Sequence, residues 1–575
     1  MMTSLMLATL ALAPVDLTTL AERSGWTQTG RYAEVEQLCA AFQKAFPFKA
    51  RCERFGTTPE GRPLLALVAS TDGSITPEWT RFRKRPVVLV QAGIHAGEID
   101  GKDAGFGVLR ELLSGNSELL KQVTVVFVPV LNVDGHERFG PNHRPNQRGP
   151  ADMGFRVTAQ NLNLNRDWVK ADAPETRAVL ALQRKWSPAL FVDLHVTDGA
   201  KFEHDVAVIT EPRGGGTEAL RKEADGLRAR ALAKLEGQGH LPVPFYPAFD
   251  VEDDPASGIT WGVTPPRFAH GYAAHRNRLS VLVETHSWRP YAHRVKTTRD
   301  TLWALLEAAA ASGAAWSKVE AEADAADLQR AGTAFPLTFG VKTTPRPLPF
   351  RGYAYTRTPS ALSGQPWTRY DESAPETWTL ALKQDVEPKL VARLPKAGWA
   401  VPAPYAARVK EVLDAHGFQY EQLKASTSLY VEVFRAKTVT FRPGPYEGRQ
   451  QVTAAGSWAR EPQVLLPGSL FVPVSQPGLW LLANLLEPES PDSLTTWGFF
   501  NAVFEQKEFL EDYVAEEEAR RMLAQDKALQ SEFDARFPAP DAGTPAERLR
   551  FFHERHPSWD THLNRVPVFR LDVRP

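Results

Sequence analysis

Apolar residues in the first half of the chain fall into short continuous runs, and between these runs they recur every three or four positions. Short continuous runs are typical of strands buried on both faces of a sheet, whereas the three-to-four spacing is typical of amphipathic helices. We therefore predict an α/β fold with a mostly parallel, doubly wound mixed sheet and helices on both of its faces. The expected strands are LLALVAS at 64–70, VVLVQAG at 87–93, VTVVFVPVL at 123–131, ALFVDLH at 189–195 and LSVLVET at 279–285.

The pattern changes after a helix that we predict over residues 300–327. The segments that follow are rich in proline and alternate strand-like runs with turns, and one clear helix is expected at 403–417. This change predicts a C-terminal α+β region. We expect the chain to divide into an α/β domain at 18–300, a helical connector at 301–330 and the C-terminal region at 331–575.

The composition narrows the classes of ligand. Lys and Arg total 67 and Asp and Glu total 68, which gives a net charge of −1, so no overall field would attract nucleic acid or an anionic membrane. We expect neither a nucleic-acid partner nor a membrane span, and the sequence leaves the oligomeric state open. The two cysteines, Cys39 and Cys52, are too few for a cysteine zinc site, so any metal ion must be bound by histidines and carboxylates.

The N-terminus carries an apolar run over residues 5–13 that ends in Ala-Leu-Ala, the small residues expected at a signal-peptidase site. A signal peptide over residues 1–13 would make the protein periplasmic or secreted, and the two cysteines could then form a disulfide. No Lys or Arg precedes the run, so the alternative is also open that these residues are a buried N-terminal segment. The protein would then be cytoplasmic, and its two cysteines would be free thiols. The run is too short to span a bilayer, which needs roughly 20 residues.

Chemistry-bearing residues follow three of the expected strands. His95 and Glu98 come just after the strand at 87–93, while His195 and Glu284 stand at the ends of two later strands. In an open α/β sheet, ligands bind beyond the carboxyl ends of the strands, so these side chains are expected at one rim. Two imidazoles and one carboxylate are the ligands of a catalytic zinc ion, and a further carboxylate can act as general base. Taken singly, His195 could cap its strand and Glu284 could form an ion pair.

Six segments, in this order, resemble the motifs of the zinc metallocarboxypeptidases, the carboxypeptidase A-like peptidases. The resemblance covers residues 20–300. The C-terminal region also resembles an extra region that we associate with bacterial members of the family. The matching segments are FGTTPEGRPLLAL at 55–67, HAGE at 95–98, VPVLNVDGHE at 128–137, NLNR at 163–166, DLH at 193–195 and VETH at 283–286.

The resemblance implies a peptidase that cleaves a C-terminal amide bond of a peptide, with one zinc ion as cofactor. His95, Glu98 and His195 match the zinc ligands, and Glu284 matches the general base and acid. In the same way, Asn165 and Arg166 match the pair that binds the free carboxylate of the substrate.

One arginine of the family, which stabilises the oxyanion, precedes the Asn-Arg pair. Arg148 lies 165 − 148 = 17 residues before Asn165, a separation that fits, and Arg144 and Arg156 are the nearby alternatives. Arg148 is therefore expected to take the catalytic role.

The chain departs from the family's pattern at three places. Asn163 stands where the family commonly has an aspartate that orients the first zinc histidine. Tyr272 is our candidate for the tyrosine that caps the substrate, and a core tyrosine would explain it equally well. The residue that sets side-chain specificity cannot be placed, although His275, Arg276 or Arg278 could favour acidic groups.

Two other functions fit the same residues. A zinc amidase or deacylase would act on cell-wall peptides or acylated amino acids, and stepwise cleavage of ordinary peptides would count against it. A binding protein on a peptidase scaffold would need no turnover, and loss of a zinc ligand or of the base would have favoured it. All four positions are filled, so we expect an enzyme whose partner is a peptide or peptide-like substrate with a free carboxylate.

Overall fold

The centre of the protein is an eight-stranded mixed sheet, seen in a computed structural model that describes residues 15–575. The signal peptide expected over residues 1–13 lies outside the described residues. The strand order is β1-β2-β4-β3-β7-β11-β8-β9. The bounds are β1 Ala50–Thr57, β2 Pro63–Ala69, β3 Val87–Ala92, β4 Thr124–Val128, β7 Leu190–Val196, β8 Val206–Glu211, β9 Pro242–Val243 and β11 Ser280–Thr285.

The middle of this sheet is parallel, because β4, β3, β7 and β11 all run in one direction. The antiparallel pairs lie to either side of it, where β2 meets β1 and β4, and where β8 meets β11. All five strands predicted from the apolar runs are present, and β4 ends at Val128 because Pro129 has no N–H to continue the ladder. The parallel strands therefore deliver their carboxyl ends to one rim, as the sequence predicted.

Helices cover both faces of the sheet, and alternate strand residues belong to the two cores. Val88 and Val90 pack into the core under α2, α4, α8 and α10, whereas Val87 and Leu89 pack into the core under α7 and α9. The α/β fold with helices on both faces is therefore confirmed. These helices are α2 Tyr32–Ala45, α4 Asp100–Ser114, α7 Pro174–Trp186, α8 Glu218–Gly237, α9 Ala269–His275 and α10 Tyr291–Asp327.

Short elements fill the connections between the main ones. They include α1 Leu20–Arg23, α3 Pro77–Phe82, α5 Leu119–Gln122, α6 Val133–Glu137 and the two-residue strands β5 Gly140–Pro141, β6 Asp152–Met153 and β10 Ile259–Thr260. Near the N-terminus, Cys39 of α2 and Cys52 of β1 are joined by a disulfide, with an Sγ–Sγ distance of 2.06 Å. From the sequence alone, a disulfide and two free thiols were both possible.

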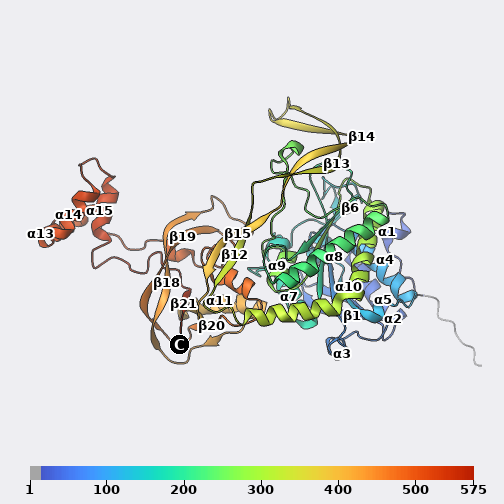
Figure 1. Cartoon of the computed structure of the whole chain (residues 1–575), viewed down its shortest axis with the longest axis horizontal. Helices are drawn as coiled ribbons and strands as arrows, with labels where there is room; N and C mark the ends of the chain where they lie inside the picture. The colour runs from blue at the N-terminus through green and yellow to red at the C-terminus, as the bar shows by residue number, and fades with distance from the viewer. Residues whose placement is uncertain (1–14) are drawn as a thin grey trace, which may run out of the picture.

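A second, antiparallel sheet forms the body of the C-terminal region, with strand order β17-β20-β16-β21-β18-β19. It packs with α11 and α12 against the α7 and α9 side of the first sheet, and one continuous core holds residues of both (Figure 1). The elements are β16 Gly398–Val401, α11 Ala403–His416, β17 Glu421–Gln422, β18 Thr427–Phe441, β19 Val452–Leu465, β20 Leu470–Pro473, α12 Leu479–Leu486 and β21 Phe569–Leu571.

The helix α10 links the two halves, and it runs without a break across residue 300, where we expected the α/β domain to end (Figure 1). It is followed by β12 Ala334–Val341, which pairs with β15 Val386–Arg393.

Two parts extend away from the body of the molecule in Figure 1. The long hairpin of β13 Arg346–Pro359 and β14 Pro366–Lys383 joins the α/β domain where β14 pairs with β10, and its side chains make further contacts there, such as the ion pair of Arg351 with Glu203. The helices α13 Asp512–Gln525, α14 Lys527–Arg536 and α15 Pro545–His553 form a small core of their own. Within residues 15–575, every helix falls short of the length and apolar character that crossing a membrane requires.

A buried arginine holds the loops at the rim of the sheet together. Arg294 of α10 is fully buried, and its Nε donates a hydrogen bond to Oδ2 of Asp100 at 2.8 Å. Its two terminal nitrogens donate to the carbonyl oxygens of Arg148 at 2.6 Å and Gly149 at 2.7 Å. Asp100 is the first residue of α4, so one guanidinium fixes α10, the start of α4 and the loop at 148–149.

We predict that Arg294→Met lowers the free energy of unfolding by about 3–5 kcal/mol, because Asp100 loses its buried partner. Arg520→Met is the matched control, since Arg520 pairs with Glu516 on the exposed face of α13 and should change the free energy by less than about 1 kcal/mol. Urea unfolding followed by tryptophan fluorescence measures both values. Equal effects in the two variants would contradict this role of Arg294.

Candidate functional site

His95 and Glu98 lie in the turn that leads from β3 to α4, at the rim of the sheet. Gly93 opens this turn with a φ of 61°, a left-handed conformation that suits glycine, and a Cβ there would lie 3.1 Å from the backbone of Val130. The backbone N–H of Glu98 donates to the carbonyl oxygen of His95 at 3.0 Å, which folds the two side chains onto one side.

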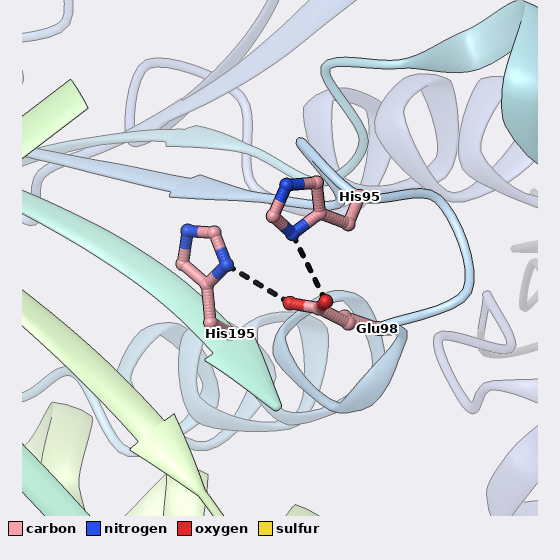
Figure 2. Close-up of side chains that lie close together, drawn as sticks. All are labelled: His95, Glu98 and His195. Atoms are coloured by element: carbon pink, nitrogen blue, oxygen red, sulfur yellow. Dashed lines mark hydrogen bonds and ion pairs between the residues drawn. The ribbon is translucent and has the colours of Figure 1, made fainter. Parts of the chain in front are cut away.

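The structure brings His95, Glu98 and His195 together (Figure 2). Nδ1 of His95 lies 2.9 Å from one carboxylate oxygen of Glu98, and Nδ1 of His195 lies 2.9 Å from the other. One ligand atom from each residue falls within 4.8 Å of the others, and all three side chains are buried. Two imidazoles and one carboxylate in this arrangement are the donor set of a catalytic zinc site, so the residues fit the metal.

The far nitrogen of each imidazole is held by an oxygen. Nε2 of His95 lies 3.0 Å from Oδ1 of Asn163, and Nε2 of His195 lies 2.8 Å from Oδ2 of Asp193. Gln91 in turn donates a hydrogen bond to Asp193 at 2.9 Å from the neighbouring strand. Partners of this kind fix the tautomer of a metal-binding histidine. Asn163 thus makes the contact that the family's aspartate would make, although it carries no charge.

The charges around the site suit a cation. Burial lowers the pKa of His95 to about 4, which keeps this imidazole neutral. Burial opposes ionisation of Glu98, but the neighbouring His95 and Arg144 hold its pKa well below the usual range. Burial likewise disfavours a charged His195, yet Asp193 raises its pKa well above 6.5, so positive charge is favoured between these carboxylates.

A cavity of about 480 Å³ opens beside this cluster. Glu284 lines it, and across the parallel pair of β11 and β7 it is the register partner of His195. Burial raises the pKa of Glu284 to about 8. The remaining wall is largely apolar and includes Val196, Ile209, Trp261, Val263, Phe268 and Leu282.

Asn165 and Arg166 line the same cavity, on a short helical turn that follows Asn163. Oδ1 of Asn165 accepts a hydrogen bond from the backbone N–H of Ala269 at 2.9 Å, and this contact fixes the amide against the start of α9. The guanidinium of Arg166 lies over the ring of Phe268, with 4.2 Å between its central carbon and the ring centroid.

Arg148 does not lie where the sequence separation predicted. Its guanidinium pairs with Glu372 of the β13–β14 hairpin, and the residue is absent from the cavity wall. Arg156 lines the cavity instead, and its Nη1 lies 3.4 Å from Oε1 of Glu98. Arg144 is buried, and its Nη1 lies 3.0 Å from Oε1 of Glu98. The separation of 17 residues did not identify the right arginine, because the loop between Arg148 and Asn165 brings Arg156 to the rim instead.

Tyr272 is a core residue and not a wall of the cavity, which corrects its expected substrate-binding role. It is buried on α9 beside Trp168, and its hydroxyl lies 3.1 Å from Nδ1 of His416 in α11. Tyr246 lines the cavity and was missed by the sequence analysis, as were Asp198 and His270. No pattern in the irregular segment before β10 marks Tyr246.

The three residues considered for specificity also point elsewhere. His275 stacks on Trp480 with 3.6 Å between the ring centroids, Arg276 lies over Phe418, and Arg278 pairs with Asp324 of α10. All three are absent from the cavity wall.

The C-terminal region reaches the site through the loop between β18 and β19. Glu447 accepts a hydrogen bond from the backbone N–H of Asn163 at 2.8 Å, and Arg449 donates to Asp172 at 2.7 Å. Asn163 holds His95, so Asn163 and Glu447, which are nearly three hundred positions apart in sequence, meet behind His95. The sequence carried no signal for this contact.

Comparison with solved structures finds metallocarboxypeptidases. Carboxypeptidase A of Helicoverpa armigera is 18% identical, covers 50% of this chain and 74% of its own, and has a TM-score of 0.37. A metallo-carboxypeptidase of Burkholderia cenocepacia is 21% identical, covers 48% of this chain and 68% of its own, and has a TM-score of 0.35.

Comparison at the level of sequence is more specific. The chain is 31% identical over 165 residues to carboxypeptidase D of Drosophila melanogaster, a match that covers 26% of this chain and 11% of that protein. Residues 35–205 match the zinc carboxypeptidase family model, and this range includes His95, Glu98 and His195. The segment that contains these three residues is therefore similar to the zinc carboxypeptidase family.

Proposed function

We propose that the protein is a zinc carboxypeptidase that removes the C-terminal residue of a peptide with a free carboxylate. The observation that carries this proposal is that one cavity contains His95, Glu98, His195, the carboxylate of Glu284 and the pair Asn165 and Arg166. The same cavity is thus lined by residues that could bind a metal, by a possible base and by a group that could bind an anion. The α/β domain at 18–300 would perform the reaction.

His95, Glu98 and His195 would hold the zinc ion, because they supply two imidazole nitrogen donors and a carboxylate within reach of one another. When bound, zinc supplies a Lewis acid that polarises the scissile carbonyl and acidifies a water molecule. Asn163 and Asp193 keep both imidazoles turned so that Nδ1 faces Glu98.

Glu284 is the proposed general base and acid. It stands on the strand next to that of His195, and its side chain lines the cavity. Only 7% of the surface of Glu284 is exposed to solvent. The carboxylate would take a proton from the attacking water and then give it to the nitrogen of the leaving amine.

The two arginines of the cavity would take separate anions. Arg156, beside Glu98, is placed to stabilise the negative charge that develops on the carbonyl oxygen. Arg166, with Asn165, would bind the terminal carboxylate of the substrate, for which a planar guanidinium is well suited. Tyr246 stands on the same wall and is our replacement for Tyr272 as the tyrosine that contacts the substrate.

We predict that Glu284→Gln lowers kcat by about 100- to 10,000-fold while the zinc content stays unchanged, because the amide cannot accept the proton. Hydrolysis of an unblocked peptide and metal analysis by mass spectrometry measure the two quantities. Glu320→Gln is the matched control, since Glu320 is also buried and accepts a hydrogen bond from Leu279 at the other end of β11. A Glu284→Gln enzyme with most of its rate would remove Glu284 from this role.

A second prediction separates the two arginines near residue 150. Arg156→Gln should lower kcat by about 100- to 1,000-fold, the usual loss when an oxyanion donor is removed. Arg148→Gln should leave kcat within about twofold, because its guanidinium faces Glu372. Steady-state kinetics on one peptide decide between them. The reverse order of effects would return the catalytic role to Arg148.

A third prediction concerns the substrate's end. Arg166→Met should lower kcat/KM by about 10- to 150-fold for a peptide with a free C-terminus, which corresponds to a charged hydrogen bond of about 1.5–3 kcal/mol. The same peptide with an amidated C-terminus should be cleaved poorly by both proteins and show no such difference. If wild type cleaves the amidated peptide as fast as the free one, the carboxylate is not recognised and the carboxypeptidase assignment fails.

A further inference from the structure

A second group of metal-ligand side chains lies outside the cavity. Asp205 immediately precedes β8, His240 follows the end of α8, and His293 lies in the first turn of α10. One donor atom from each falls within 4.8 Å of the others, and within residues 15–575 only this group and the one at His95 meet that criterion. Asp205 and His240 are buried, whereas the side chain of His293 is 43% exposed.

The arrangement repeats that of the first group. The Oδ2 atom of Asp205 lies 2.7 Å from Nδ1 of His240 and 3.1 Å from Nε2 of His293, so one carboxylate again stands between two imidazoles. The corresponding distances in the first group are both 2.9 Å. A tetrahedral zinc ion with ligand bonds of about 2.0–2.2 Å holds its donor atoms about 3.3–3.6 Å apart, so it fits between these atoms after they separate by roughly half an ångström.

The far nitrogen of His240 also has a carboxylate partner. Its Nε2 lies 3.1 Å from Oδ2 of Asp300, as Nε2 of His195 lies beside Asp193. A carboxylate in this position is the usual outer partner of a metal-binding histidine, because it orients the ring and raises its basicity. The backbone N–H of Leu241 donates to the other oxygen of Asp205 at 2.8 Å, which leaves Oδ2 directed at the two imidazoles.

The local charges favour a cation between these side chains. Lys296 and Arg299 both pair with Asp300, so they offset the carboxylate on the far side of His240 and leave Asp205 facing the imidazoles.

We propose that Asp205, His240 and His293 form a second zinc site, separate from the cavity. Two imidazoles select zinc and neighbouring transition metals over magnesium and calcium, which prefer oxygen ligands. The exposed edge of His293 gives the ion a path from solvent and leaves room for a water molecule as the fourth ligand.

The position of this site suggests a structural role. The carbonyl oxygen of Asp205 accepts a hydrogen bond from the backbone N–H of His286, two residues after Glu284. Asp205 also ends the loop that starts at β7 and carries Asp198 on the cavity wall. A metal ion here would tie the end of that loop to α10 and to the segment after α8. The binding site itself does not depend on the proposed peptidase activity.

The test is zinc stoichiometry in the full chain. Metal-free protein is equilibrated with Zn²⁺, separated by gel filtration and analysed by mass spectrometry, while competition with a chelating dye gives the affinities. Wild type should bind about two ions, and the double variant His95→Ala/His195→Ala, which lacks the first site, should bind about one. Co²⁺ in the double variant should give the visible absorption of a tetrahedral site.

Variants of the second site complete the test. In the double-variant background, His293→Ala should weaken Zn²⁺ binding on the order of 100-fold, and Asp300→Asn by about 10- to 100-fold. His562→Ala is the matched control, since His562 is an exposed histidine outside both groups, and it should leave the affinity unchanged. His293 is partly exposed, so its loss should leave the circular dichroism spectrum intact. No binding by the double variant, or binding that His293→Ala leaves unchanged, would overturn the proposal.

Discussion

The buried carboxylate of Glu98 is the constraint on which the rest of the site depends. An unpaired charge in this position would be costly, and two imidazoles, two arginines and the backbone N–H of Val196 at 3.1 Å surround it. These partners come from three parts of the chain and must arrive in one orientation. The turn after β3, the end of β7 and the loop at 144–166 are therefore fixed relative to one another by a single side chain.

The same requirement extends outward from the site. His95 is held by Asn163, and Asn163 is held by Glu447 from the C-terminal region. Arg294 ties Asp100, just after the turn that carries His95 and Glu98, to the loop that leads towards Arg156. The C-terminal half thus contributes no side chain to the cavity wall, yet it stabilises the loop that presents Asn165 and Arg166. A rigid support is the role for this region that the contacts favour.

Prediction from the sequence succeeded where local patterns and strand ends decide position. The parallel strands were recognisable as continuous apolar runs, and residues just after such strands must lie at one rim, so His95, Glu98, His195 and Glu284 could be placed together. Prediction failed for side chains on irregular loops. Arg148 was chosen by its separation from a motif, but separation along a loop does not fix direction in space. Tyr246 was missed for the same reason. Tyr272 was expected to face the substrate, and the structure instead places it on the buried side of α9.

The sequence by itself therefore determined the α/β layers, the rim and the three metal-ligand candidates, because hydrophobic periodicity is a local property that repeats along the chain. Only the tertiary structure decided which arginine and which tyrosine face the cavity, because those positions depend on long loops and on their packing. It alone brought Glu447 behind Asn163 and gathered Asp205, His240 and His293 from three separate elements. Contacts of that kind are set by the folding of distant segments onto one another, and no local pattern records them.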